Sequence, residues 1–236
     1  MMELDQTTGT PANKAGNSGI ITAVAAVGVG AALMSATRSA RAVTPALTYA
    51  QIQGTGDIKV LNYALSLEYL EADLYAQAIM RLTTGGTNAL GIAIPGLNLT
   101  GPDVDYITEF AVVEADHRDF LKAALGSQAM AGFKYDFNMQ NRTRAQVSAV
   151  VYDAELTGVG AYLGAIPDFA TKTYVPVAAA ILGTEARHTA AMAIVQNILF
   201  NTNIETAPLA NENNGRDTPV DPDTVLAHVS PFIVVS

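Results

Sequence analysis

Two of the three histidines in this chain follow a glutamate by three positions. The two pairs are Glu114 with His117 and Glu185 with His188. Residues three apart on a helix lie on the same face, so a carboxylate and an imidazole at this spacing reach the same point in space. A single pair is common as a surface ion pair. Two pairs, in a chain with only nine glutamates, indicate a metal site instead.

A second pair of matched motifs combines a glutamate with a tyrosine seven positions later. Glu68 precedes Tyr75 in LEYLEADLY, and Glu155 precedes Tyr162 in AELTGVGAY. Seven residues are almost two helical turns, so each tyrosine is expected along the face that carries its glutamate. Both glutamates interrupt an apolar stripe, where an unpaired carboxylate is costly. A cation is therefore expected beside them.

Metal ions compensate these charges better than the neighbouring arginines, because Arg118 and Arg187 each point about a quarter turn away from the adjacent histidine. One glutamate from each of two helices, with Glu-x-x-His from each of two others, is the ligand pattern of di-iron and di-manganese carboxylate bundles. Ligation by oxygen and imidazole without sulfur suits iron or manganese, and zinc is chemically compatible. We predict two Fe or Mn ions per chain, with these ligands: Glu68, Glu114, His117, Glu155, Glu185 and His188.

The elements that must position these residues are predicted to be helices. Apolar residues recur at helical spacing in four stretches, and strand-like alternation is missing from all of them. The first begins at the expected cap Asp57, and the others cover about 103–125, 143–165 and 175–200. The apolar face of the second includes Tyr106, Phe110 and Phe120, which we expect in the core. Four long helices, each with one polar face, predict an all-α four-helix bundle in a domain of residues 43–200.

Charge and composition exclude several other classes of function. Lys and Arg total 13 against 22 Asp and Glu, a net charge of −9, and no basic run is present. Nucleic acid is therefore not an expected partner. The absence of cysteine excludes disulfides, zinc ribbons, thiol redox chemistry and cysteine-ligated iron–sulfur clusters.

Residues 1–42 combine a polar tail with an uncharged segment at 19–36, GIITAVAAVGVGAALMSA. Its length is at the lower limit for a membrane span, and Ala40-Arg41-Ala42 has the form of a signal cleavage site. Acidic residues before the segment and arginines after it count against a secretory signal. Three interpretations stay open for this segment: a signal, a membrane anchor, or an apolar helix for subunit packing.

Residues 201–236 are predicted to form an extended C-terminal tail, with one short helix after Asp221-Pro222. The apolar end PFIVVS is expected to dock on some surface, either of this chain or in an assembly. His228 has no carboxylate at ligand spacing, so we interpret it as a structural or exposed residue.

With these motifs in place, residues 57–200 resemble the ferritin-like superfamily. The opening VLNYALSLEYLEADLY most resembles its exported, desiccation-related branch. The resemblance implies the same six ligands, with Glu114 and either Glu155 or Glu185 bridging the metals. It also implies Tyr75 and Tyr162 as the catalytic candidates, either as hydrogen-bond donors or as redox-active neighbours of the metals.

Two local features leave alternatives open. Glu71, one turn after Glu68, is a spare ligand, a group that supports a ligand, or a surface charge, and we favour the supporting role. Gly158, Gly160 and Gly164 either thin the third helix to give access to the metals or allow close packing, and packing is the favoured interpretation.

Two functions from different classes fit the sequence. The first is a redox-active dinuclear protein that reacts with oxygen or peroxide, with ferrous oxidation, peroxide removal or oxidation of a small substrate as the outcome. The second is a structural, self-assembling or stress-protective protein in which the metals hold the bundle together. In either case we expect a homo-oligomer exported to the periplasm, cell surface or exterior, with membrane association through 19–36 as an alternative.

Overall fold

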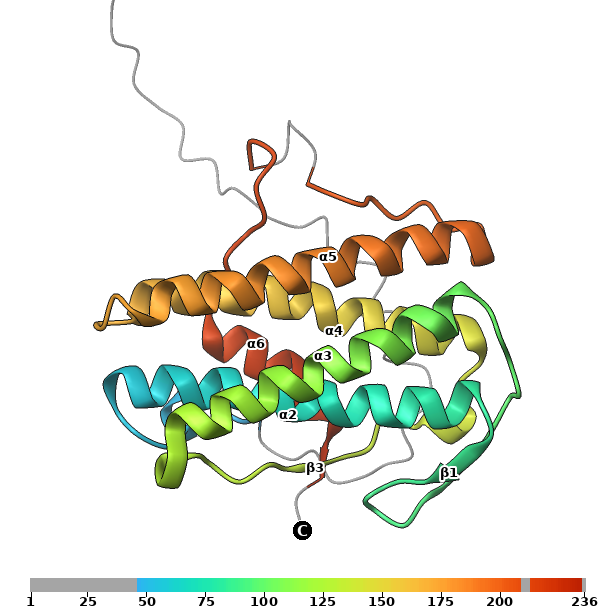
Figure 1. Cartoon of the computed structure of the whole chain (residues 1–236), viewed down its shortest axis with the longest axis horizontal. Helices are drawn as coiled ribbons and strands as arrows, with labels where there is room; N and C mark the ends of the chain where they lie inside the picture. Colours follow the sequence, from blue (N-terminus) through green and yellow to red (C-terminus); the bar gives the residue numbers. More distant parts are fainter. Residues whose placement is uncertain (1–45, 209–212, 235–236) are drawn as a thin grey trace, which may run out of the picture.

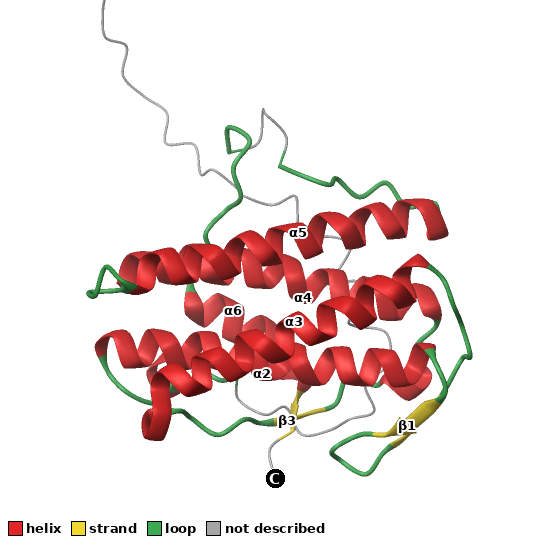
Figure 2. Ribbon diagram, in the orientation of Figure 1, coloured by secondary structure: helices red, strands yellow, loops and turns green. Residues whose placement is uncertain are grey.

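The computed structural model describes residues 46–208 and 213–234, and four long helices dominate it (Figure 1, Figure 2). In Figure 1 the first two form a hairpin in the lower half of the molecule, and the other two form a hairpin in the upper half. The helices are α2 (Gly56–Leu82), α3 (Pro102–Leu125), α4 (Arg144–Ala165) and α5 (Tyr174–Phe200). This confirms the predicted all-α four-helix bundle. The predicted signal, anchor or assembly segment in 1–42 lies outside the described residues.

Of the four long helices described, only α4 has a side-chain hydrogen bond at its N-terminal cap. At α4, Thr143 and Gln146 form a capping box, in which each side chain accepts a hydrogen bond from the backbone of the other. The prediction that Asp57 caps α2 is wrong, because Thr55 occupies that position. The Asp57 carboxylate instead accepts hydrogen bonds from backbone N–H groups of residues 170–171, which ties the start of α2 to the loop before α5.

Helix α2 is buried on all sides over its first half, from Val60 to Glu68. The single polar face expected for it is therefore absent there, because other chain segments cover its outer surface. The side chain of Asn62 holds two of these segments: its amide N–H groups donate to the carbonyls of Gln53 and Gln128, and its oxygen accepts from the N–H of Met130. A buried amide satisfied on both ends stabilises this arrangement.

Helix α3 differs from expectation in the opposite way. Tyr106 and Phe120, both predicted on its buried face, are 40% and 50% exposed. The reason is that α3 packs mainly against α2, and α5 mainly against α4. Helices α3 and α5 therefore pack only loosely against each other, which leaves these two side chains partly exposed.

The outer surface of α4 is covered by an extended segment that contains Val220. The N–H of Val220 donates to the carbonyl of Gly160 at 2.9 Å. A Cβ atom at Gly164 would lie 2.0 Å from the Val220 carbonyl oxygen, which no real side chain tolerates. Gly160 and Gly164 therefore serve close packing, with this segment rather than another helix as the partner.

The end of the described chain docks as predicted. Helix α6 (Pro222–Val229) starts after Asp221, whose carboxylate accepts from two N–H groups of its first turn. Strand β4 (Ile233–Val234) then pairs antiparallel with β3 (Lys134–Tyr135).

The other strands, β1 (Gly85–Thr87) and β2 (Ala93–Pro95), form a hairpin between α2 and α3. The remaining elements are short 3₁₀ turns, namely η1 (Tyr49–Gln51), η2 (Gly126–Gln128), η3 (Met139–Asn141), η4 (Ile166–Asp168) and η5 (Ser230–Phe232).

Across residues 46–208 and 213–234, none of the helices has the length and apolar character needed to cross a membrane. Residues 19–36, the predicted candidate, are outside this range.

Candidate metal centre

All six predicted ligands meet in the middle of the bundle, and each of the four long helices contributes at least one. The four glutamates have no solvent exposure, and His188 is also buried. The side chain of His117 is 13% exposed, so it is the ligand candidate nearest the solvent. Their convergence from four helices places a strongly charged cluster inside an apolar core.

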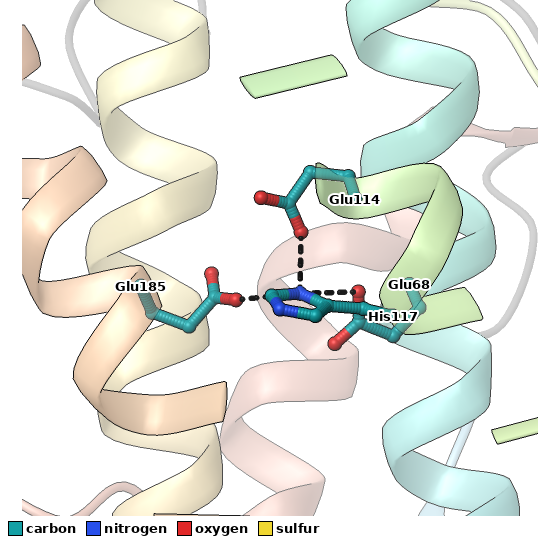
Figure 3. A group of neighbouring side chains, drawn as sticks. All are labelled: Glu68, Glu114, His117 and Glu185. Carbon is teal, nitrogen blue, oxygen red and sulfur yellow. Dashed lines mark hydrogen bonds and ion pairs between the residues drawn. The ribbon is translucent and has the colours of Figure 1, made fainter. Parts of the chain in front are cut away.

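The first group of side chains surrounds His117 (Figure 3). Its Nδ1 atom lies 3.0 Å from an oxygen of Glu114, 3.4 Å from one of Glu185 and 3.6 Å from one of Glu68. One ring nitrogen donates at most one proton, so it cannot satisfy three carboxylates by hydrogen bonding. The ligand atoms of all four residues lie within 4.8 Å of one another, which suits a single cation between them.

The second group contains Glu114, Glu155 and His188, again with ligand atoms within 4.8 Å of one another. Nδ1 of His188 lies 2.8 Å from Oε1 of Glu114 and 3.3 Å from Oε2 of Glu155. In the first group it is the other oxygen of Glu114, Oε2, that faces His117. Glu114 therefore directs one oxygen to each group, as a bridging carboxylate must, whereas Glu155 and Glu185 each belong to one group.

The two tyrosines bind the ligand candidates in a crossed arrangement. Tyr162 on α4 donates to Oε1 of Glu68 on α2 at 2.5 Å, and Tyr75 on α2 donates to Oε1 of Glu155 on α4. The sequence placed each tyrosine on the face that carries the glutamate of its own helix and named no bonding partner; the partner is the glutamate of the facing helix. The crossing leaves Oε2 of both glutamates without a hydrogen-bond partner and free for a cation.

Further unpartnered atoms support a metal at this position. Both oxygens of Glu185, Oε1 of Glu114 and Nδ1 of His188 are buried without a partner in hydrogen-bond geometry. Within the described ranges, no lysine or arginine forms an ion pair with any of the four glutamates. Buried carboxylates without compensation are strongly destabilising, so this donor set fits two divalent cations.

The acid–base properties of the cluster show where protons sit when no metal neutralises it. Burial raises the pKa of Glu68 to about 7, against the lowering effect of His117. Burial also acts on Glu114, but the contacts of its two oxygens with His117 and His188 hold its pKa below the usual value. Burial would lower the histidine pKa values, yet the surrounding carboxylates raise that of His117 to about 12 and that of His188 to about 9. Metal binding must therefore displace protons from the imidazoles.

The rings of His188 and Phe110 stack, with centroids 3.8 Å apart and planes 17° from parallel. The sequence predicted Phe110 only as a core residue. Its position one turn before Glu114 was the available signal for a role beside the cluster. The stacked ring restricts the orientation of the imidazole and shields it from solvent.

Glu71 lies beside the same cluster, which excludes the surface-charge interpretation. Its side chain is buried and Oε2 has no hydrogen-bond partner. Burial, and the nearby charges of Glu185 and Glu68, raise its pKa well above the usual value.

His228 takes the structural role expected for it. Its Nε2 pairs with Oδ2 of Asp153 at 2.8 Å, which joins α6 to α4, and it belongs to neither ligand group. The sequence could not predict this pair because the two residues are far apart in the chain.

An apolar cavity of about 190 Å³ reaches Tyr162 from between α2, α3 and α5. Leu61, Phe120 and Ile181 are among the side chains that line it. Because Tyr162 bonds Glu68, the cavity ends one residue away from the cluster.

Comparison with known proteins identifies the family to which the helical bundle belongs. A family model described as a ferritin-like domain matches residues 56–197, from the first residue of α2 to the last turn of α5. The match covers more than half of the chain and includes all six ligand candidates. No curated protein matches the sequence.

Proposed function

The chain belongs to the ferritin-like family, and from this premise we propose that it holds two iron or manganese ions which react with oxygen or peroxide. The observation that carries the proposal is the position of Glu114, whose two oxygens face two different histidines. Cation positions on either side of this carboxylate would lie within the two groups of unpartnered ligand atoms.

In this proposal Glu68, His117 and Glu185 hold one ion, Glu155 and His188 hold the other, and Glu114 contacts both. The bound ions supply the redox chemistry with oxygen or peroxide, which carboxylates and imidazoles alone do not provide.

The residues of the chain itself bind, orient and shield. The hydroxyl of Tyr75 donates a hydrogen bond to Oε1 of Glu155, and that of Tyr162 donates to Oε1 of Glu68. These bonds fix the direction of Oε2 in both glutamates. Burial of the four carboxylates excludes bulk water. The cavity beside Tyr162 has room for a small uncharged molecule such as oxygen or hydrogen peroxide.

A structural role is the second candidate, favoured by the origin of the ligands on four different helices. Ions held there link both hairpins, and binding to the folded state alone raises stability. Under either function we further propose an exported, stress-protective homo-oligomer. The support for this comes from the likeness of VLNYALSLEYLEADLY to the exported, desiccation-related branch.

The test is metal stoichiometry by elemental analysis, after anaerobic loading of the full chain with Fe²⁺ or Mn²⁺. We expect about two ions per chain for the wild type, and fewer than about one for Glu114→Gln, which removes a ligand shared by both positions. Glu109→Gln, on the exposed surface of the same helix, is the matched control and should load like the wild type.

Oxygen and peroxide consumption by the loaded protein then separates the two functions. Consumption that Glu114→Gln abolishes supports the redox role, whereas a raised melting temperature without consumption supports the structural role. A wild type that takes up no metal would overturn both.

A further inference from the structure

Glu71 is a carboxylate that the six-ligand arrangement leaves without a role. It lies one helical turn after Glu68, so both side chains leave the same face of α2. Its side chain is 3% exposed, and Oε2 has no hydrogen-bond partner. Among the described residues, no lysine, arginine or histidine pairs with it. A buried carboxylate in this condition needs either a proton or a cation to neutralise it.

Gly158 on α4 shows where this carboxylate points. A Cβ atom at Gly158 would lie 3.2 Å from Oε1 of Glu71 and 2.9 Å from Oε2 of Glu185. Both carboxylates therefore face the same small space over α4, which only a glycine leaves open. No hydrogen bond joins the two carboxylates across the described residues.

An ordinary hydrated carboxylate does not explain this position. The cavity lined by Glu71 and Gly158 has a volume of about 20 Å³ and is otherwise mostly apolar, with room for one water molecule at most. A single water does not replace the hydration of an ionised carboxylate.

We propose that Glu71 is a seventh metal ligand, which contributes an oxygen to the ion held by Glu185. The inference rests on the proposed function and deepens it. The ion held by Glu185 already has one ligand more than the other ion, and Glu71 adds further negative charge around it. Binding of two divalent ions should therefore proceed in two distinguishable steps.

The direct test is a crystal structure of the Mn²⁺-loaded full chain, with manganese located by anomalous scattering. We expect an oxygen of Glu71 within about 2.5 Å of one ion, the range of metal–oxygen bonds. Glu71 bound only to Glu185, or to a water in the adjacent cavity, would overturn the inference.

The second test is titration of the metal-free protein with Co²⁺, followed by its visible absorption. Glu71→Gln is expected to weaken one of the two binding steps about tenfold or more and to change the spectrum of that ion only. Glu109→Gln is the control for both readouts and should change neither.

The outcomes separate this inference from the proposed function. A wild type that binds two ions, with an unchanged Co²⁺ spectrum in Glu71→Gln, rejects the seventh ligand alone. A wild type that binds no ion rejects the metal centre altogether. If Glu71→Gln fails to fold by circular dichroism, Glu71→Asp keeps the charge and shortens the reach, and it is expected to weaken the same single step.

Discussion

The two hairpins of the bundle deliver the same chemistry from different surroundings. Each presents a glutamate, a tyrosine seven residues later and a Glu-x-x-His motif, and the crossed tyrosine bonds relate one half to the other. They differ three residues after the first glutamate, where α2 has Glu71 and α4 has Gly158. They differ again four residues before the Glu-x-x-His glutamate, where α3 has Phe110 and α5 has Ile181.

These differences make one side of the centre more charged and the other more apolar. The α2 side adds a buried carboxylate, and α4 supplies only the space for it. His188 is shielded by the stacked ring of Phe110, whereas His117 reaches the surface. The lesson is that the repeated residues define the two ligand groups, and the residues one turn away distinguish those groups.

The outer faces of the hairpins differ as well, at a position nine residues after the first glutamate. On α2 this residue is Gln77, whose amide donates to the carbonyl of Tyr135 in β3. On α4 it is Gly164, which lets the backbone at Val220 approach directly. Both faces are covered by extended chain, one through a side chain and one through the absence of a side chain.

The largest expected effect comes from filling the space that distinguishes α4 from α2. Gly158→Ala places a Cβ atom against Glu185 and Glu71, so their flexible carboxylates must move while the backbone adapts. We expect metal affinity to fall about tenfold or more, measured by competition with a chromophoric chelator.

Gly183→Ala on α5 is the matched control, because nothing lies within 4 Å of its added Cβ. It should leave metal affinity unchanged and stabilise the fold by up to about 1 kcal/mol through helix propensity. Equal metal affinity in both variants would show that the space at Gly158 has no role in metal binding.

A smaller effect tests whether the crossed tyrosines are equivalent. Tyr75→Phe and Tyr162→Phe each remove one donor to a buried carboxylate, so each should lower the free energy of unfolding by about 1–3 kcal/mol. The measurement is denaturant unfolding of the metal-free protein with both variants side by side. Losses that differ by more than about 1 kcal/mol would contradict the equivalence of the two halves.

The smallest effect concerns an ion pair that only the second hairpin carries. The hydrogen bond to Asp153 raises the pKa of His228, although burial opposes it. A raised folded-state pKa stabilises fully below the unfolded value of about 6.5, and the contribution disappears as pH rises through the folded value. His228→Gln should therefore lose at most about 1 kcal/mol near pH 5.5 and less near pH 9.

Urea midpoints of the wild type and His228→Gln at both pH values provide the measurement. The equivalent of Asp153 on α2 is Ser66, whose hydroxyl donates to the carbonyl of Tyr63 in the same helix. A larger deficit at high pH would reverse the sign and contradict the assignment of the pair.

The sequence predicted the four helices and the family because apolar period and ligand spacing are local properties. The bounds of α3, α4 and α5 agree with those predictions to within one residue. The convergence of six ligand candidates followed from the same spacing, since a bundle core admits few positions for them. The exported, desiccation-related assignment stays a proposal.

What the sequence could not give depends on contacts between distant segments. Spacing along one helix places Tyr75 on the face of Glu68, but the bond goes to Glu155 because the facing helix is nearer to the hydroxyl. The position of Asp57 predicts a helix cap, yet its carboxylate accepts a hydrogen bond from a loop more than a hundred residues later in the chain. The burial of α2 on all sides from Val60 to Glu68 depends likewise on segments that precede and follow this helix in the chain, at Gln53 and Gln128.

The segment from Thr218 to Val234 has a consequence for the order in which the molecule is completed. It covers α4 through Val220 and pairs with β3, and it accepts hydrogen bonds from Leu47 and Tyr49 through Ser230 and Asp223. Every ligand-bearing helix leaves the ribosome before this segment does. A nascent chain can therefore hold all six ligand candidates while its outer surfaces are still uncovered, and translation of the segment then closes the fold around them.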